Sequence, residues 1–96
     1  MPTYIVLYQF TDQGAKDIAG TVKRANEARA ENEQRGFKVQ GLFWTQGRYD
    51  IVAVVDAPDE QAMLAGLFNI ARAGNVRTET LRAFTADEMQ AVLRKM

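Results

Sequence analysis

The chain has 96 residues, enough for one domain, and its 47% hydrophobic and 25% charged residues are typical of a soluble globular protein. Twelve Lys and Arg balance twelve Asp and Glu, so no basic surface for nucleic acid is expected. The sequence contains neither His nor Cys, which excludes Ser-His-Asp triads, Cys nucleophiles and metal, haem or iron-sulfur sites built on these residues.

The first segment with a clear pattern runs from Thr3 to Phe10 and is rich in β-branched and aromatic residues, which predicts a strand. Its apolar side chains alternate between two faces, with Tyr4, Val6, Tyr8 and Phe10 on one and Ile5 and Leu7 on the other. A strand that is apolar on both faces is expected in the middle of a sheet, covered on both sides.

From Ala15 to Arg35 the apolar residues recur at helical spacing, which predicts one helix with a cap at Thr11 or Asp12 and an end at Gly36. Gly14 weakens the start of this helix. The stripe expected to be buried consists of Ala15, Ile18, Ala19, Val22 and Ala25.

Two further strands are predicted next. Residues 37–45 alternate as in an edge strand, and Gly41 inside them indicates a bulge or a close backbone approach. Residues 46–48 form a turn, and residues 49–57 return as a second central strand because 51–55 are all apolar.

A second helix is expected to begin with Pro58 in its first position and to end at Gly74. Asp59 and Glu60 in its first turn complement the helix dipole. Its predicted buried face comprises Met63, Leu64, Leu67, Phe68, Ile70 and Ala71.

The last two elements are an edge strand over residues 75–84 and a short helix over residues 86–95. Thr85 and Glu88 stand at the spacing of a capping box before that helix. The helix is expected to bury Met89, Val92 and Leu93.

The order βαββαβ followed by a helix predicts an α+β, ferredoxin-like antiparallel sheet in a single domain over residues 1–96. Two helices cover only one face of such a sheet, so the other apolar face would be left in water. We therefore expect two sheets to pack face to face in a homodimer or a higher oligomer. The sequence does not tell which sheet face makes that contact.

The cellular compartment is predicted from the first residues and from the length of the apolar runs. Residues 1–10 have no charged start of a signal peptide, and no apolar run reaches the roughly 18 residues of a membrane span. A cytoplasmic protein without a membrane partner is expected.

The turn and strand at residues 47–50 read GRYD, and three other segments accompany it: YIVLYQFTDQG, DAPDE and GNVRTETLRAFT. Together they resemble the GYD-domain family over residues 4–88. The resemblance implies a ferredoxin-like fold related to the dimeric α/β-barrel proteins, and it implies no known reaction. The related cofactor-free oxygenases and haem-degrading enzymes place their chemistry between helices and sheet. The haem branch commonly uses a His ligand, which this chain lacks.

Tyr49 and Asp50, in the GRYD segment, form the first candidate site. As structural residues they would pack at a strand start and cap free N–H groups of the turn. As functional residues, Asp50 would be a buried carboxylate with a raised pKa, acting as a general base or ligand anchor beside the Tyr49 hydroxyl.

Two other groups are candidates. Arg77 and Glu79 lie on one face of an edge strand, where they are solvated, bridge a subunit contact, or hold an anionic ligand through the Arg. The strand aromatics form the core, the dimer interface or a pocket for a planar apolar molecule, to which Tyr8 or Trp44 would offer a polar contact. The acids near the second helix are explained by capping, so no metal site and no cofactor are expected.

Two functions remain open. The first is a homo-oligomeric regulatory or small-molecule-binding protein, and the absence of His favours it because enzymes of this size usually use His for proton transfer. The second is a cofactor-independent oxygenase or isomerase, in which Tyr8, Trp44, Tyr49, Asp50 and Arg77 would position the substrate and its developing charge.

Overall fold

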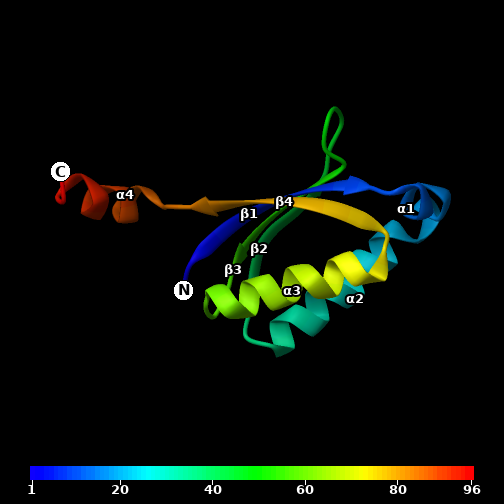
Figure 1. The fold of residues 1–96 in the computed structure, drawn as a ribbon, viewed down its shortest axis with the longest axis horizontal. Helices are drawn as coiled ribbons and strands as arrows, with labels where there is room; N and C mark the ends of the chain where they lie inside the picture. The colour runs from blue at the N-terminus through cyan, green and yellow to red at the C-terminus, as the bar shows by residue number, and fades with distance from the viewer.

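The computed structural model describes residues 1–96. Along the chain it contains, in order, β1 (Thr3–Phe10), α1 (Asp12–Lys16), the short 3₁₀ helix η1 (Ile18–Gly20), α2 (Thr21–Gln34), β2 (Lys38–Trp44), β3 (Ile51–Asp56), α3 (Glu60–Ala73), β4 (Val76–Ala83) and α4 (Ala86–Leu93). The four strands form one antiparallel sheet in the order β2-β3-β1-β4. This is the expected ferredoxin-like α+β fold (Figure 1).

The sheet is organised around β1, which pairs with β4 along its whole length and with β3 over most of it. The predictions that β1 and β3 are central and that β2 and β4 are edges are confirmed. The register of β2 on β3 shifts between Val39 and Gly41, so the predicted irregularity at Gly41 is confirmed as well.

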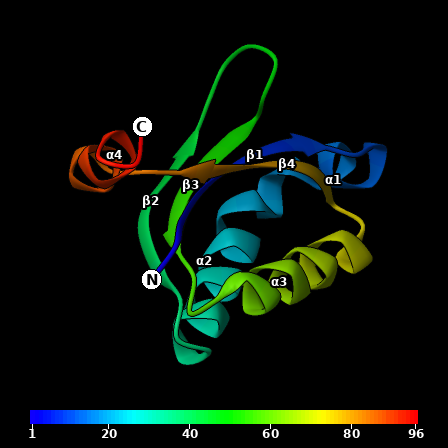
Figure 2. The same cartoon turned by 60° about the vertical axis from the view of Figure 1, so that its left-hand side comes forward.

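One face of the sheet is covered by α2 and α3, as Figures 1 and 2 show. The core lies between this face and the helices and is small, since only nine residues are buried. Seven of them form one cluster: Tyr4, Val6, Phe37, Ala53, Val55, Ala57 and Met63. Tyr4 and Val6 come from β1, so the alternate set that begins with Tyr4 faces the helices.

The other face of the sheet carries no helix. The strand register places six apolar side chains larger than Ala on it: Ile5, Leu7, Phe43, Val52, Val54 and Leu81. Phe43 is 61% exposed and Leu81 is also exposed, while the other four are shielded only in part by their neighbours. We call these six residues the open sheet face. An antiparallel sheet that meets water on one side normally has polar side chains there.

The single helix predicted from Ala15 to Arg35 is wrong, because the chain is divided into α1, η1 and α2. Thr11 caps α1 as expected and also anchors it to the turn before β4, donating from its N–H to the Asn75 carbonyl oxygen at 3.0 Å and from Oγ1 to the Gly74 carbonyl oxygen at 2.6 Å. The chain must then change direction to lay α2 on the sheet. It does so at Asp17, whose carbonyl oxygen accepts from the Arg24 guanidinium at 2.8 Å.

This break also rotates the helix face that meets the sheet. Of the stripe expected to be buried, Ala15, Ile18, Ala19 and Val22 are exposed and only Ala25 is half-buried. The inner face of α2 instead presents Thr21, Arg24, Ala25, Ala28 and Asn32.

The second long helix begins two residues later than predicted. Asp59 caps α3 by accepting from the Ala62 N–H at 2.7 Å, so Pro58 precedes the helix. The predicted buried face was also too wide: Met63 is buried and Leu67 and Ile70 are half-buried, while Leu64, Phe68 and Ala71 are exposed. These three lie on an exposed flank of α3.

The last helix has the predicted capping box between Thr85 and Glu88. The expected burial of Met89, Val92 and Leu93 is wrong, because they are 40–47% exposed. Figure 1 shows α4 beyond the end of the sheet and away from the other helices. Its position helps to raise the radius of gyration to 14.4 Å, against about 13 Å for a compact chain of this length.

The anchoring of α1 explains Gly14 and gives a test of the fold. A Cβ at Gly14 would collide with the Asn75 carbonyl oxygen, a backbone atom that cannot move freely. We expect Gly14→Ala to lower the free energy of unfolding by about 1–3 kcal/mol, the usual cost of overpacking, as measured by urea denaturation.

Gly66→Ala is the matched control, because a Cβ there would meet only the Phe37 ring at 3.6 Å. Replacing a helical glycine raises stability by about 0.5–1 kcal/mol. Equal effects of the two substitutions would contradict the packing described for Gly14.

Candidate functional site

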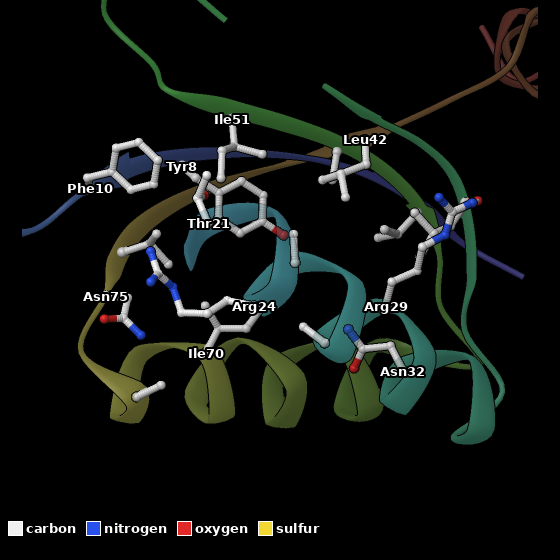
Figure 3. A pocket seen from close by; sticks show the side chains of 17 residues that line it. Tyr8, Phe10, Thr21, Arg24, Arg29, Asn32, Leu42, Ile51, Ile70 and Asn75 are labelled. Carbon is white, nitrogen blue, oxygen red and sulfur yellow. The ribbon is translucent and has the colours of Figure 1, made fainter. Parts of the chain in front are cut away.

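A cavity of about 180 Å³ lies between the covered face of the sheet and the two long helices (Figure 3). Twelve of its 17 lining residues are hydrophobic. The sheet contributes side chains from all four strands, and the apolar side chains from the helices are three alanines, Ala25, Ala28 and Ala73, together with Ile70. The cavity exists because the three alanines do not fill the space under the sheet.

The polar groups of the cavity come mainly from α2. They are Tyr8 from β1, Thr21, Arg24, Arg29 and Asn32 from α2, and Asn75 from the turn before β4. No Asp or Glu is among the 17 lining residues. The cavity therefore combines apolar walls with two positive charges and several neutral polar groups.

Tyr8 projects from the sheet toward the helices, as Figure 3 shows. Burial raises the pKa of Tyr8 above its ordinary value of 10.0, and no hydrogen bond contributes to this shift. The phenol is thus protonated at neutral pH and can donate a hydrogen bond to a molecule in the cavity.

The two arginines already have partners on the rim. Arg24 donates from one terminal nitrogen to the Asp17 carbonyl oxygen and carboxylate, both at 2.8 Å. Arg29 donates to the Glu33 carboxylate at 3.1 Å and to the Val39 carbonyl oxygen at 3.3 Å. Each guanidinium has five N–H donors, so both keep donors that can meet a ligand.

These residues are better suited to binding than to proton transfer. A general base needs a pKa near the working pH. The cavity offers a phenol with a raised pKa and two guanidinium groups, but no carboxylate, amine or imidazole. Its own side chains therefore supply hydrogen-bond donors, positive charge and apolar surface.

Of the residues singled out from the sequence, Tyr8 lines the cavity. Trp44 lies at its border, because its indole N–H donates to the Thr21 hydroxyl at 3.1 Å and Thr21 is a lining residue. This bond joins the end of the edge strand β2 to the start of α2.

Tyr49 and Glu79 meet elsewhere, on the side of the sheet that carries the open sheet face. The Tyr49 hydroxyl lies 3.1 Å from both carboxylate oxygens of Glu79. Arg77 is two residues from Glu79 on β4 and is exposed on the same side, opposite Gln9. These three residues form a polar group at one end of the open sheet face and do not line the cavity.

Asp50 connects strands rather than facing the cavity. Its carboxylate accepts from the Phe10 N–H at 2.8 Å, and its own N–H donates to the Tyr8 carbonyl oxygen at 2.8 Å. These bonds hold the last residues of β1, two of which line the cavity, to the start of β3.

The residues that sequence reasoning missed are those of α2: Thr21, Arg24, Arg29 and Asn32. The stripe predicted from the spacing leaves these four residues out, because it assumes one unbroken helix from Ala15. In the structure α2 begins at Thr21, after the break, and these residues line the cavity.

No group of acidic side chains in the chain is placed to hold a metal ion. None of the helices combines the length and the hydrophobicity needed to cross a membrane.

Comparison with known proteins adds two findings. The model of the GYD domain matches residues 4–93. A protein of Thermus thermophilus named "Glutamine synthetase and cystathionine beta-lyase binding protein" is 35% identical over 95 residues, which cover 98% of this chain and all of that protein. No solved structure matches the chain at a significant level.

The environment of Tyr8 makes a testable prediction. Since its pKa is higher in the folded than in the unfolded chain, the folded protein keeps a proton that the unfolded chain gives up above about pH 10. Tyr8 therefore stabilises the fold fully below that pH, and its contribution is lost as the pH rises toward the folded-state pKa.

We expect the melting temperature of Tyr8→Phe to fall less than that of the wild type between about pH 9 and pH 11. Thermal melts followed by circular dichroism measure this difference. Parallel pH profiles of the two proteins would show that Tyr8 is not buried in the cavity as described.

Proposed function

The chain belongs to the GYD-domain family, and from this membership we propose that it is a homodimeric regulatory protein that binds partner enzymes and holds a small molecule in its cavity. The observation that carries this proposal is the open sheet face, an apolar surface that the chain does not cover itself. The name of the relative supports a binding role rather than a catalytic one.

The open sheet face fits a second copy of the chain because it has the layout of an interface. Its centre is formed by apolar side chains of the two middle strands, Ile5, Leu7, Val52 and Val54. Interfaces of stable dimers have such an apolar core inside a polar rim. Packing two of these faces against each other removes both from water in one step.

Polar groups border the apolar centre at both ends. At one end the Thr3 hydroxyl donates to the Asp56 carboxylate at 2.6 Å, and the Gln40 amide donates to the same carboxylate at 2.7 Å. At the other end lies the Tyr49–Glu79 pair with Arg77 nearby. The formal net charge of zero means that two copies do not repel each other.

The position of α4 also favours a dimer. Its apolar residues Met89, Val92 and Leu93 lie beyond the end of β4 and are exposed. Leu81, on β4 just before this helix, belongs to the open sheet face. A second copy seated on that face extends the interface onto α4.

Partner enzymes would use a different surface, the exposed flank of α3. Leu64 and Phe68 are one helical turn apart there, and Phe68 is 64% exposed. This flank lies on the helical side of the sheet, so it stays free when two sheets pack face to face. Large apolar side chains in such positions commonly anchor protein interfaces.

In the proposed function, the cavity is the site where a small molecule regulates the binding of partner enzymes. Its volume and apolar walls suit a small molecule, and it lies directly beneath α3, whose Ile70 and Ala73 line it. A ligand there would fix α2 and α3 on the sheet and so bias the surface that the partner enzyme meets.

The dimer is tested by Phe43→Lys, with Phe68→Lys as the matched control. The two phenylalanines are 61% and 64% exposed but lie on opposite sides of the molecule. An unpaired charge at a buried interface costs several kcal/mol, and each 1.4 kcal/mol is about tenfold in Kd. We expect Phe43→Lys to weaken the dimer at least about 100-fold and Phe68→Lys to leave it unchanged.

Sedimentation equilibrium measures the mass of the protein in solution and so distinguishes a dimer from a monomer. The wild type and Phe68→Lys should have twice the chain mass of 10.8 kDa at micromolar concentration, and Phe43→Lys should have the chain mass. A wild-type monomer at that concentration would overturn the dimer.

Enzyme binding is tested with the purified glutamine synthetase and cystathionine beta-lyase of the organism that encodes this chain. We expect the wild type to bind at least one of them in biolayer interferometry and Phe68→Lys to bind it at least about tenfold more weakly, since anchor residues commonly contribute more than 1 kcal/mol. No binding of the wild type to either enzyme would contradict the choice of partners, and equal binding of Phe68→Lys would contradict the choice of surface.

A further inference from the structure

We propose that the cavity between sheet and helices binds a small apolar acid, with the hydrocarbon part under the sheet and the carboxylate held by Arg24. This inference rests on the small-molecule part of the proposed function and names the chemical class of the ligand. Four features of the cavity support it: size, charge, the state of Arg24, and the arrangement of the polar groups.

The size of the cavity limits the hydrocarbon part. An engineered apolar cavity of about 150 Å³ binds benzene. The cavity here measures about 180 Å³ and has apolar walls from all four strands. It therefore accommodates one aromatic ring or a branched chain of similar size, and it is too small for a nucleotide or a haem.

The charge of the cavity selects an anion. Two guanidinium groups and no carboxylate are among its lining residues. A cationic ligand would meet like charge there, while a carboxylate would gain charge-assisted hydrogen bonds in partly dry surroundings. The lone phenol of Tyr8 donates to the same kind of group, because it stays protonated at neutral pH.

Arg24 is better placed than Arg29 to hold the carboxylate. Its side chain is 25% exposed, against 43% for Arg29, so its charge is less screened by water. A single terminal nitrogen of Arg24 makes both bonds to Asp17, which leaves the other donors of the fork free. The Asp17 side chain is 73% exposed and can return to water at little cost when a ligand carboxylate replaces it.

The neighbours of Arg24 complete the polar end of the site. Thr21 is three residues earlier on α2, and its hydroxyl oxygen accepts from Trp44, so its own hydrogen is free to donate. Figure 3 shows the Arg24 and Arg29 side chains toward different ends of the pocket, with Tyr8 between them. Arg24 also lines a second pocket between α2 and α3, which shares Ala28 and Ile70 with the cavity, so Arg24 lies where the two pockets adjoin.

The test compares ligands of one shape and different charge: benzoate, benzamide and benzylamine, with acetate as a carboxylate without a ring. Isothermal titration measures affinity, and amide shift changes in ¹H–¹⁵N NMR locate the site. We expect benzoate to bind at least about tenfold more tightly than benzamide, and benzylamine and acetate to show no saturable binding. The shifts should centre on residues 21–32 and on Tyr8.

Variants test the assignment of each part. Ala28→Leu places a larger side chain in the cavity and should abolish benzoate binding, while Ala30→Leu on the exposed side of the same helix should not change it. Arg24→Gln should lower the affinity for benzoate at least about tenfold and leave the affinity for benzamide unchanged. Arg29→Gln should change both affinities by less than about threefold. Circular dichroism confirms that each variant is folded.

The outcomes separate this inference from the proposed function. Equal binding of benzoate and benzamide would overturn the anion selectivity and leave a small-molecule pocket. If Arg29→Gln rather than Arg24→Gln lowered the affinity for benzoate, the role of Arg24 would be overturned. If none of the four probes binds, the ligand class is wrong, whereas dimerisation and enzyme binding are measured independently and stand or fall on their own results.

Discussion

The constraint on which this structure depends is a sheet with apolar side chains on both faces in a chain that has helices for only one of them. The alternation on β1 sends Tyr4 and Val6 toward the helices and Ile5 and Leu7 to the open sheet face. Because the chain supplies no second layer, few residues are buried, and α4 finds nothing of its own to pack on. In the proposed dimer, a second copy on the open sheet face covers these apolar side chains and gives α4 a surface to pack on.

On the covered side of the sheet, the side chains of α2 and α3 do not fill the space between the helices and the strands. The inner face of α2 carries small or polar side chains where a helix of a closed core would carry Leu or Ile. The Asp17–Arg24 contact and the packing of Gly14 on Asn75 hold the helical layer at one end. The space left between these supports is a cavity with apolar walls and two arginines among its lining residues, and these properties govern what it can bind.

Much of the fold could be predicted from local patterns. The strands were found from their alternation, and Gly36 and Gly74 mark helix ends with positive φ angles of 91° and 83°. Thr85 and Glu88 form the predicted capping box. These features depend on neighbours in sequence, so the sequence reports them directly.

The candidate site could be predicted only in part, because it depends on where helices lie relative to the sheet. Tyr8 was found from its strand, but Arg24 was missed since the break at Asp17 is fixed by the distant turn at Asn75. The prediction that Leu64 and Phe68 are buried was wrong for a similar reason. Helical spacing tells which residues share a face of the helix, but not how much of that face contacts the sheet. The pairing of Tyr49 with Glu79 likewise joins segments 30 residues apart.

The most direct measurement is isotope-filtered NMR on a mixture of labelled and unlabelled chains, which detects contacts between copies only. The sheet-face dimer predicts intermolecular contacts among the methyl groups of Ile5, Leu7, Val52 and Val54. Contacts confined to the flank of α3, or no intermolecular contact at all at millimolar concentration, would contradict it.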